Sequence, residues 1–124
     1  MILINKFDNR YDGTPLSLCP IMRVAVNEKK ILYIYKQQSG RKEDNGMVYS
    51  VIVLDDGTYI MCKDDIGEFD SLVRFKHERY DMLINKDNVQ MLQEDGWKTI
   101  VFFNKEEDYL NIFDKFDEVV GRLG

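Results

Sequence analysis

The chain of 124 residues has 44% hydrophobic and 31% charged residues, a composition that fits one globular domain and excludes a disordered segment. No apolar run approaches the roughly 20 residues of a membrane span, and residues 1–6 lack the basic leader and long apolar stretch of a signal peptide. Cys19 and Cys62 lie far apart and outside any Cys-x-x-Cys pair. We therefore expect a cytoplasmic protein with two reduced thiols and no membrane attachment.

The formal net charge of −5 comes from the C-terminal part of the chain. Residues 1–77 hold 11 Lys/Arg and 11 Asp/Glu, whereas residues 78–124 hold 6 and 11. This balance disfavours a general nucleic-acid binder, which needs clustered cations, and it permits a basic protein partner. The alternative is that the acid only keeps a small protein soluble.

Alternating apolar residues and turn chemistry predict five strands in the first part of the chain: residues 1–7, 22–26, 31–35, 47–54 and 58–62. The Asp55-Asp56-Gly57 sequence suits a tight hairpin turn between the last two strands. Pro15 and Pro20 make residues 14–20 an irregular or edge segment. The polar residues 36–46 form a loop, which is either an insertion without a role or a place for binding contacts.

A helix is predicted over residues 65–77. Asp65 followed by Glu68 resembles an N-terminal capping box. The apolar positions that follow have helical spacing: Ile66, Phe69, Leu72 and Val73.

The second part of the chain repeats this order of elements. Strands are predicted at residues 81–85, 89–93 and 97–103. Asn104 with Glu107 forms another N-terminal cap, and a stripe of apolar residues predicts a helix from there to about residue 123.

The two parts align as an internal repeat, about 22–77 and 80–123. At a constant offset of 58 residues, 25–28 and 31–34 correspond to 83–86 and 89–92. The predicted fold is a single α+β domain over residues 1–124. In it, two tandem β-strand/β-strand/helix units share one core, with a mainly antiparallel sheet and two helices on one face.

No catalytic or metal-binding motif is found in the sequence. His77 is the only histidine and falls at the end of a predicted helix, where a cation has a routine structural role. The acidic pairs at 55–56 and 64–65 have local explanations in a turn and a helix cap, and no calcium or phosphate loop surrounds them. We predict no catalytic residue, no metal ligand and no cofactor. The enzymatic alternative is His77 acting with a nearby carboxylate.

Several aromatic and basic residues are candidates for binding contacts. Tyr33 and Tyr35 share one face of a strand, which is either core and rim or an exposed patch. Trp97 follows Gly96 at a turn, where an aromatic residue commonly anchors a hairpin or an interface. Arg41 and Lys42 in the polar loop could contact a nucleotide.

Part of the chain resembles known small proteins. Val26-Asn27, Ile31 and the run Val53-Leu54-Asp55-Asp56-Gly57, with the acidic helix expected after them, are similar to flagellar-operon proteins of the FlbD type and to part of the LytTR DNA-binding domain. The similarity covers about 50 residues and consists of apolar spacing and a turn. It implies a strand–turn–strand–helix unit and carries no functional residue.

The predicted function is that of a small, non-enzymatic acidic binding protein, such as an inhibitor or immunity-type protein, that engages a basic protein partner. The predicted contacts are the acidic residues Glu94, Asp95, Glu107, Asp108, Asp114 and Glu118. One alternative is a sensor of a small molecule or nucleotide, with a pocket at the repeat or dimer interface lined by tyrosines and Arg41. Another is a regulatory protein with no ligand of its own. A homodimer stays open, and nucleic acid is not an expected partner.

Overall fold

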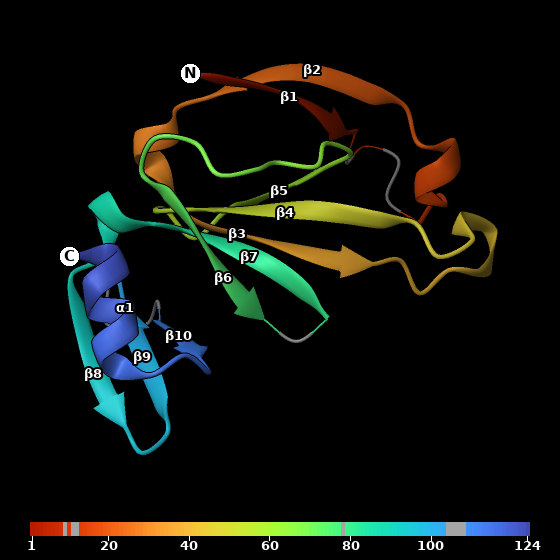
Figure 1. Ribbon diagram of the computed structural model, residues 1–124. Helices are drawn as coiled ribbons and strands as arrows, with labels where there is room; N and C mark the ends of the chain where they lie inside the picture. Colours follow the sequence, from red (N-terminus) through yellow and green to blue (C-terminus); the bar gives the residue numbers. More distant parts are fainter. Residues whose placement is uncertain (9, 11–12, 78, 104–108) are drawn as a thin grey trace.

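The structure, a computed structural model, describes residues 1–8, 10, 13–77, 79–103 and 109–124. Its strands form two antiparallel sheets (Figure 1). The larger sheet has the strand order β2-β1-β5-β4-β3-β7-β6, and the smaller has the order β10-β9-β8. We call β1 to β5 the N-terminal unit, and β6 to β10 with α1 the C-terminal unit.

The N-terminal unit combines a hairpin with a three-stranded meander. Its strands are β1 (Ile2–Phe7), β2 (Ile21–Val26), β3 (Ile31–Gln38), β4 (Val48–Leu54) and β5 (Tyr59–Cys62). Short 3₁₀ helices lie between them: η2 (Leu16–Leu18), η3 (Glu28–Lys30) and η4 (Lys42–Asp44). β1 also pairs with β5 through Lys6 and Cys62, and this pairing closes the unit.

The C-terminal unit has the same order of strands and ends in a helix. Its elements are β6 (Leu72–His77), β7 (Tyr80–Asn85), the 3₁₀ helix η5 (Lys86–Asn88), β8 (Met91–Asp95), β9 (Lys98–Phe102), β10 (Tyr109–Ile112) and α1 (Phe116–Leu123). No ladder joins β6 to β10 within the described ranges. The meander therefore forms a separate sheet, with α1 beside it in Figure 1.

The two meanders, β3-β4-β5 and β8-β9-β10, pair their strands in equivalent registers. Ile34 lies opposite Ile52 on β4, and Leu92 lies opposite Val101 on β9. The hydroxyl of Ser50 donates to Asp64 O at 2.7 Å, and the hydroxyl of Thr99 donates to Asp114 O at 3.0 Å. Each meander thus ties its middle strand to the chain that follows its last strand by the same kind of hydrogen bond.

The prediction of two helices on one face of the sheet is wrong, because the protein is mostly β, with α1 as the one α-helix among the described residues. Residues 72–77 of the first predicted helix form β6, in which Val73 and Phe75 pair with Ile84 and Met82 of β7. Leu72 and Phe75 of this strand are buried, whereas Phe69 of the predicted helix stripe is exposed.

The capping residues of that predicted helix have other roles. Glu68 accepts a hydrogen bond from the backbone N–H of Arg74 at 3.0 Å, and Asp65 forms an ion pair with Lys36. His77 accordingly lies at the end of a strand, opposite Tyr80, and not at a helix terminus.

The second predicted helix is also shorter than expected. Tyr109–Ile112 pairs with β9 as strand β10, and α1 begins only at Phe116. The predicted cap at residues 104 and 107 lies outside the described residues. No helix in the part of the chain that the structure describes is long and apolar enough to cross a membrane.

A core shared by the two units holds the meander of the C-terminal unit in place. Phe103, Val101 and Ile112 of that unit cluster with Val119 and Leu123 of α1. Leu32 of the N-terminal unit belongs to the same cluster, and Tyr33 stacks on Phe103 with 5.6 Å between the ring centroids. Removing this apolar surface from water is the main stabilising contribution here.

Asparagine side chains connect the two units at the 3₁₀ helices. Asn85 is buried, and its amide donates to Ile31 O at 2.8 Å and to Glu28 O at 3.0 Å. Asn88 also donates to Ile31 O, at 2.6 Å. These bonds add side-chain donors from the C-terminal unit to backbone carbonyls of the N-terminal unit.

Candidate functional site

Two exposed aromatic side chains lie together at the turn end of the smaller sheet. Gly96, with a φ of +62°, allows the tight turn between β8 and β9 and leaves Trp97 at its tip. Trp97 is 72% exposed and Phe113 is 51% exposed. Their rings are stacked, with 5.3 Å between centroids and 14° between planes. Two large apolar rings are thus presented to solvent in a defined orientation.

Acidic residues flank this aromatic pair. Glu94 lies opposite Thr99 on β9, whose hydroxyl bonds to the backbone of Asp114. Asp95 is adjacent to the turn and pairs with Lys98 at 3.6 Å. Glu118 lines the same surface hollow as Phe113 and Asp114.

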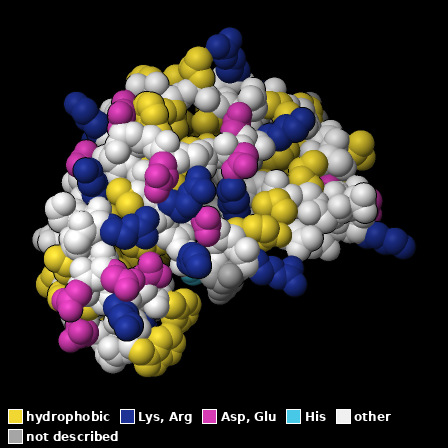
Figure 2. All heavy atoms as spheres, viewed as in Figure 1, with side chains coloured by type: hydrophobic (Ala, Val, Ile, Leu, Met, Phe, Trp, Pro, Cys, Tyr) yellow, Lys and Arg dark blue, Asp and Glu magenta, His cyan; other side chains and the backbone are white. Residues whose placement is uncertain are grey.

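We call the set Glu94, Asp95, Trp97, Phe113, Asp114 and Glu118 the aromatic–acidic patch. Figure 2 shows hydrophobic and acidic side chains side by side over the lower end of the molecule, where this sheet lies. Of the six predicted acidic contacts, four lie in the patch, whereas Glu107 and Asp108 lie outside the described residues.

The described charges of this region are mostly negative. In residues 89–103 and 109–124 there are five carboxylates (Glu94, Asp95, Asp114, Asp117 and Glu118) against three cations (Lys98, Lys115 and Arg122). Arg122 lies 3.9 Å from Asp114 and donates to the backbone O of Arg74, so it is held toward β6. The patch therefore combines an apolar centre with four carboxylates, of which Asp95 and Asp114 are paired with Lys98 and Arg122, and basic residues of β6 line the hollow beside it.

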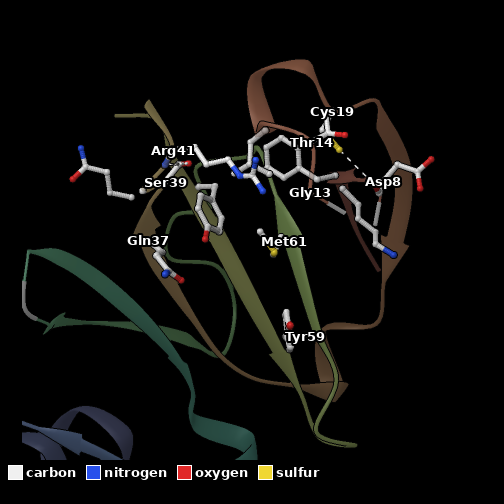
Figure 3. A pocket seen from close by; sticks show the side chains of 15 residues that line it. Asp8, Gly13, Thr14, Cys19, Gln37, Ser39, Arg41, Tyr59 and Met61 are labelled. Atoms are coloured by element: carbon white, nitrogen blue, oxygen red, sulfur yellow. Dashed lines mark hydrogen bonds between the residues drawn. The ribbon is translucent and has the colours of Figure 1, made fainter. Parts of the chain in front are cut away.

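A pocket of about 410 Å³ lies in the N-terminal unit, on the opposite side of the fold (Figure 3). The end of β1, the segment before β2, the β3–β4 loop (residues 39–47) and the strands β4 and β5 form its walls. Its lining residues are Lys6, Phe7, Asp8, Gly13, Thr14, Leu16, Cys19, Gln37, Gln38, Ser39, Gly40, Arg41, Tyr49, Tyr59 and Met61. We call it the Arg41 pocket.

The loop that carries Arg41 is anchored by a buried carboxylate. Asp44 accepts hydrogen bonds from the hydroxyl of Ser39 and, at 2.8 Å, from the backbone N–H of Ser17. These two donors lower the pKa of Asp44 to about 2, because both favour the ionised carboxylate. Asp44 thereby ties the β3–β4 loop to η2, which forms the facing wall of the pocket.

A second carboxylate, in the wall of the pocket, is already paired with a cation. Asp8 is buried and accepts hydrogen bonds from Arg10, at 3.1 Å from Nε and 2.7 Å from Nη2. The hydrogen bond from Arg10 lowers the pKa of Asp8, so this carboxylate stays ionised and paired. The thiol of Cys19 donates to Asp8 O at 3.4 Å.

The predicted loop and aromatic candidates separate into different places. Arg41 lines the pocket, whereas Lys42, its neighbour in the chain, is exposed and is not in the lining. Tyr33 and Tyr35 are half-buried and pack against the shared core, with 6.1 Å between their rings. Burial, and secondarily the charge of Tyr59, raise the pKa of Tyr35.

Sequence reasoning missed several residues of both sites. Phe113 was assigned to the core face of a helix that does not exist at that position. Tyr49 and Met61 reach the Arg41 pocket only because β4 and β5 pair beneath the β3–β4 loop, with Val51 opposite Met61. The predicted strands contained these residues, but no local signal shows which loop covers them.

The remaining candidates for chemistry in the described part of the chain are metal ligands, the two cysteines and the histidine. There, no three His, Cys, Asp or Glu side chains come close enough to hold a metal ion. Both cysteines are free thiols, and burial raises the pKa of Cys62 to about 11. The one histidine lies on β6 in neither of the two sites.

No protein-family model matches the chain, and neither do the curated proteins or the solved structures with which it was compared. None of these comparisons supports the resemblance to FlbD-type proteins or to LytTR domains. Function must therefore be argued from the sites themselves.

Proposed function

We propose that the chain is a non-enzymatic binding protein that engages a basic segment of a protein partner through the aromatic–acidic patch. The observation that carries the proposal is the stacked pair Trp97–Phe113, exposed at the surface beside four carboxylates. Buried aromatic anchors, Trp above all, contribute most of the binding energy at protein interfaces. An exposed aromatic pair of fixed geometry is suited to that role.

The charge of the patch supports a basic partner. The carboxylates of the patch come from β8, from the chain after β10 and from α1. Opposite charges on two surfaces speed their encounter and favour one orientation. Two copies of this chain joined through the patch would instead bring like charges together, so a partner of opposite charge fits better than self-association.

The neighbouring sheet face offers room for a larger interface. Met91, Phe102 and Tyr109 form a cross-strand row on the solvent face of the smaller sheet, since Met91 and Tyr109 both lie opposite Phe102. Met91 and Tyr109 are exposed, and the rings of Phe102 and Tyr109 lie 6.1 Å apart. A partner seated on Trp97 could extend over this row.

The experiment is affinity capture from the native source followed by a binding measurement with the purified partner. Trp97→Ala is compared with Tyr59→Ala, because Tyr59 is similarly exposed, at 66%, but lies in the other unit. We expect Trp97→Ala to weaken binding about 30-fold, which corresponds to about 2 kcal/mol. Tyr59→Ala should leave the affinity unchanged.

The charge contribution has its own measurement. Replacing Glu94 and Asp95 by Gln and Asn should slow association and reduce its dependence on salt, while the dissociation rate stays nearly constant. A partner that binds Trp97→Ala as tightly as the wild type, or one with an acidic contact surface, would overturn the proposal.

A further inference from the structure

We infer that the Arg41 pocket binds a small planar molecule that carries an anionic group, with the guanidinium of Arg41 as the contact for the anion. This inference is independent of the proposed function, because the pocket and the aromatic–acidic patch lie in different units and share no residue.

Arg41 is a cation without a counter-charge in the described structure. Arg10 and Arg122 lie within 4 Å of a carboxylate, whereas the guanidinium of Arg41 has no ion pair or hydrogen bond among the described residues. Two carboxylates of the segments around the pocket already have partners. Asp8 is held by Arg10, and Asp44 by Ser39 and Ser17.

The side chain of Arg41 also has the right position. Figure 3 shows it extending from the β3–β4 loop across the pocket, toward the wall that carries Gly13 and Thr14. Guanidinium groups bind carboxylates and phosphates through two parallel hydrogen bonds. Gln37, which also lines the pocket, offers a further polar group.

Another part of the lining is aromatic and apolar, and its rings Phe7 and Tyr49 are largely buried. Phe7 and Tyr49 meet edge to face, with 6.4 Å between their centroids, and they cluster with Val51, Leu16 and Met61. Tyr59 stands exposed at the far end of the pocket (Figure 3). A flat ring fits such a lining, since aromatic side chains gain from stacked or edge-on contact.

Hydrogen bonds within the chain hold the loop that carries Arg41 in place. Asp44 fixes the β3–β4 loop to η2, and Ser39 N–H donates to Met47 O at 2.8 Å across the base of the loop. Asn45 and Gly46 have φ values of +50° and +76°, so the loop makes a sharp left-handed turn there. A volume of about 410 Å³ lies within the range of small-molecule sites, about 300 to 1,000 Å³.

The C-terminal unit lacks the loop and most of the pocket lining, although Tyr109 stands where the N-terminal unit has Tyr59. Its β8–β9 connection is the tight turn at Gly96 and Trp97. By the shared register, Lys98 stands where the N-terminal unit has Tyr49, and Asn111 stands where it has Met61. The loop, the cation and the aromatic wall are thus found together in one unit and absent together from the other.

The test is a titration of the ¹⁵N-labelled protein with three probes: AMP, 4-hydroxybenzoate and inorganic phosphate. We expect saturable shifts of the amides of Ser39, Arg41 and Tyr49 with AMP or 4-hydroxybenzoate. The two arms distinguish a nucleotide phosphate from an aromatic carboxylate. Inorganic phosphate, which lacks a ring, should bind at least tenfold more weakly than the better of the two.

Arg41→Gln is compared with Lys42→Gln, which removes a neighbouring cation outside the pocket. The first change should weaken binding about tenfold or more, and the second less than twofold. Cys19 provides a second readout, because a bound ligand should slow its modification by a thiol reagent. The inference is overturned if none of the probes shifts the pocket amides at 10 mM, or if Arg41→Gln binds as tightly as Lys42→Gln.

Discussion

The two units of this protein use the same order of strands but are closed in different ways. In the N-terminal unit, β1 pairs with β5, and the meander belongs to the larger sheet. In the C-terminal unit, no ladder links the corresponding strands in the described ranges, and α1 lies beside the seam. Arg122 of α1 donates to Arg74 O of β6 and lies over the ring of Phe75 at 4.3 Å.

One pair of positions has different polar contacts in the two units. Asn5 on β1 donates to both carboxylate oxygens of Asp64, at 2.6 Å from its backbone N and 3.0 Å from its amide. The corresponding residues of the C-terminal unit are Lys76 and Asp114. Lysine has no amide with which to reproduce this paired bond, and Asp114 pairs instead with Arg122 of the helix. The two units therefore differ in their polar contacts at this closure as well as in the element that closes them.

The largest expected effect on stability comes from the contact between the units. Phe103 is 1% exposed and stacks on Tyr33, whereas Leu54, its counterpart by register, is only half-buried. Phe103→Ala should lower the free energy of unfolding by about 3–5 kcal/mol, and Leu54→Ala by about 1–2 kcal/mol. Urea unfolding of both variants measures this. Equal losses of unfolding free energy would mean that the contact between Phe103 and the N-terminal unit adds no stability beyond that of an ordinary half-buried side chain.

The two cap asparagines provide a sharper comparison, because they occupy the same place in each unit. Asn27 and Asn85 both accept a hydrogen bond from the backbone N–H two residues later, each at 3.1 Å. Only Asn85 also donates to buried carbonyls, those of Glu28 and Ile31.

Asn85→Ala should therefore cost about 2–4 kcal/mol of unfolding free energy, since it removes a cap together with two hydrogen bonds that link the units. Asn27→Ala should cost about 1 kcal/mol, the usual value of a cap. The midpoints of denaturant unfolding distinguish the two. An Asn27→Ala variant as unstable as Asn85→Ala would contradict the assignment of Asn85 as the link between the units.

Sequence patterns predict the strands except β6 and β10, and they do not show the contacts that decide between strand and helix there. Asp55-Asp56-Gly57 predicted the β4–β5 hairpin because the turn chemistry is local. At residues 72–77 the apolar positions fit a helix with Ile66 and Phe69, but they also alternate as Val73 and Phe75 separated by Arg74. Pairing with β7 selects the strand, and this pairing is not visible in a short window of sequence.

The residues of the two sites also divide into those that local sequence features predict and those that only the tertiary fold brings together. Trp97 and the acidic residues around it were predicted from a turn and from uneven charge, both of which are local features. Phe113 was missed, because its position depends on where α1 begins. The polar loop pointed to Arg41, whereas its partners on β1, β4 and β5 come from parts of the chain that only the tertiary fold brings together.

The smallest expected effect concerns the loop that distinguishes the N-terminal unit from the C-terminal unit. The pKa of Asp44 falls from an ordinary value of 3.8 to about 2 in the folded protein, because Ser39 and Ser17 donate to the carboxylate. A carboxyl group whose pKa is lower in the folded protein than in the unfolded chain stabilises the fold, and this contribution is fully present at pH values above the pKa of the unfolded chain. The attachment of the β3–β4 loop should therefore hold above pH 4 and weaken as the pH falls from about 4 toward 2.

Two measurements follow from this. The carboxyl ¹³C of Asp44 and the amide of Ser17 should titrate together with a midpoint near 2, and the gap in Tm between the wild type and Asp44→Asn should narrow over the same pH range. Glu43→Gln, a change at an exposed neighbour in η4, should leave both unchanged. A midpoint near 4 would mean that Asp44 does not hold the loop. The β3–β4 loop would then not be a fixed wall of the Arg41 pocket. The two units would differ at this place only in the length of the connection, a loop between β3 and β4 against a tight turn between β8 and β9.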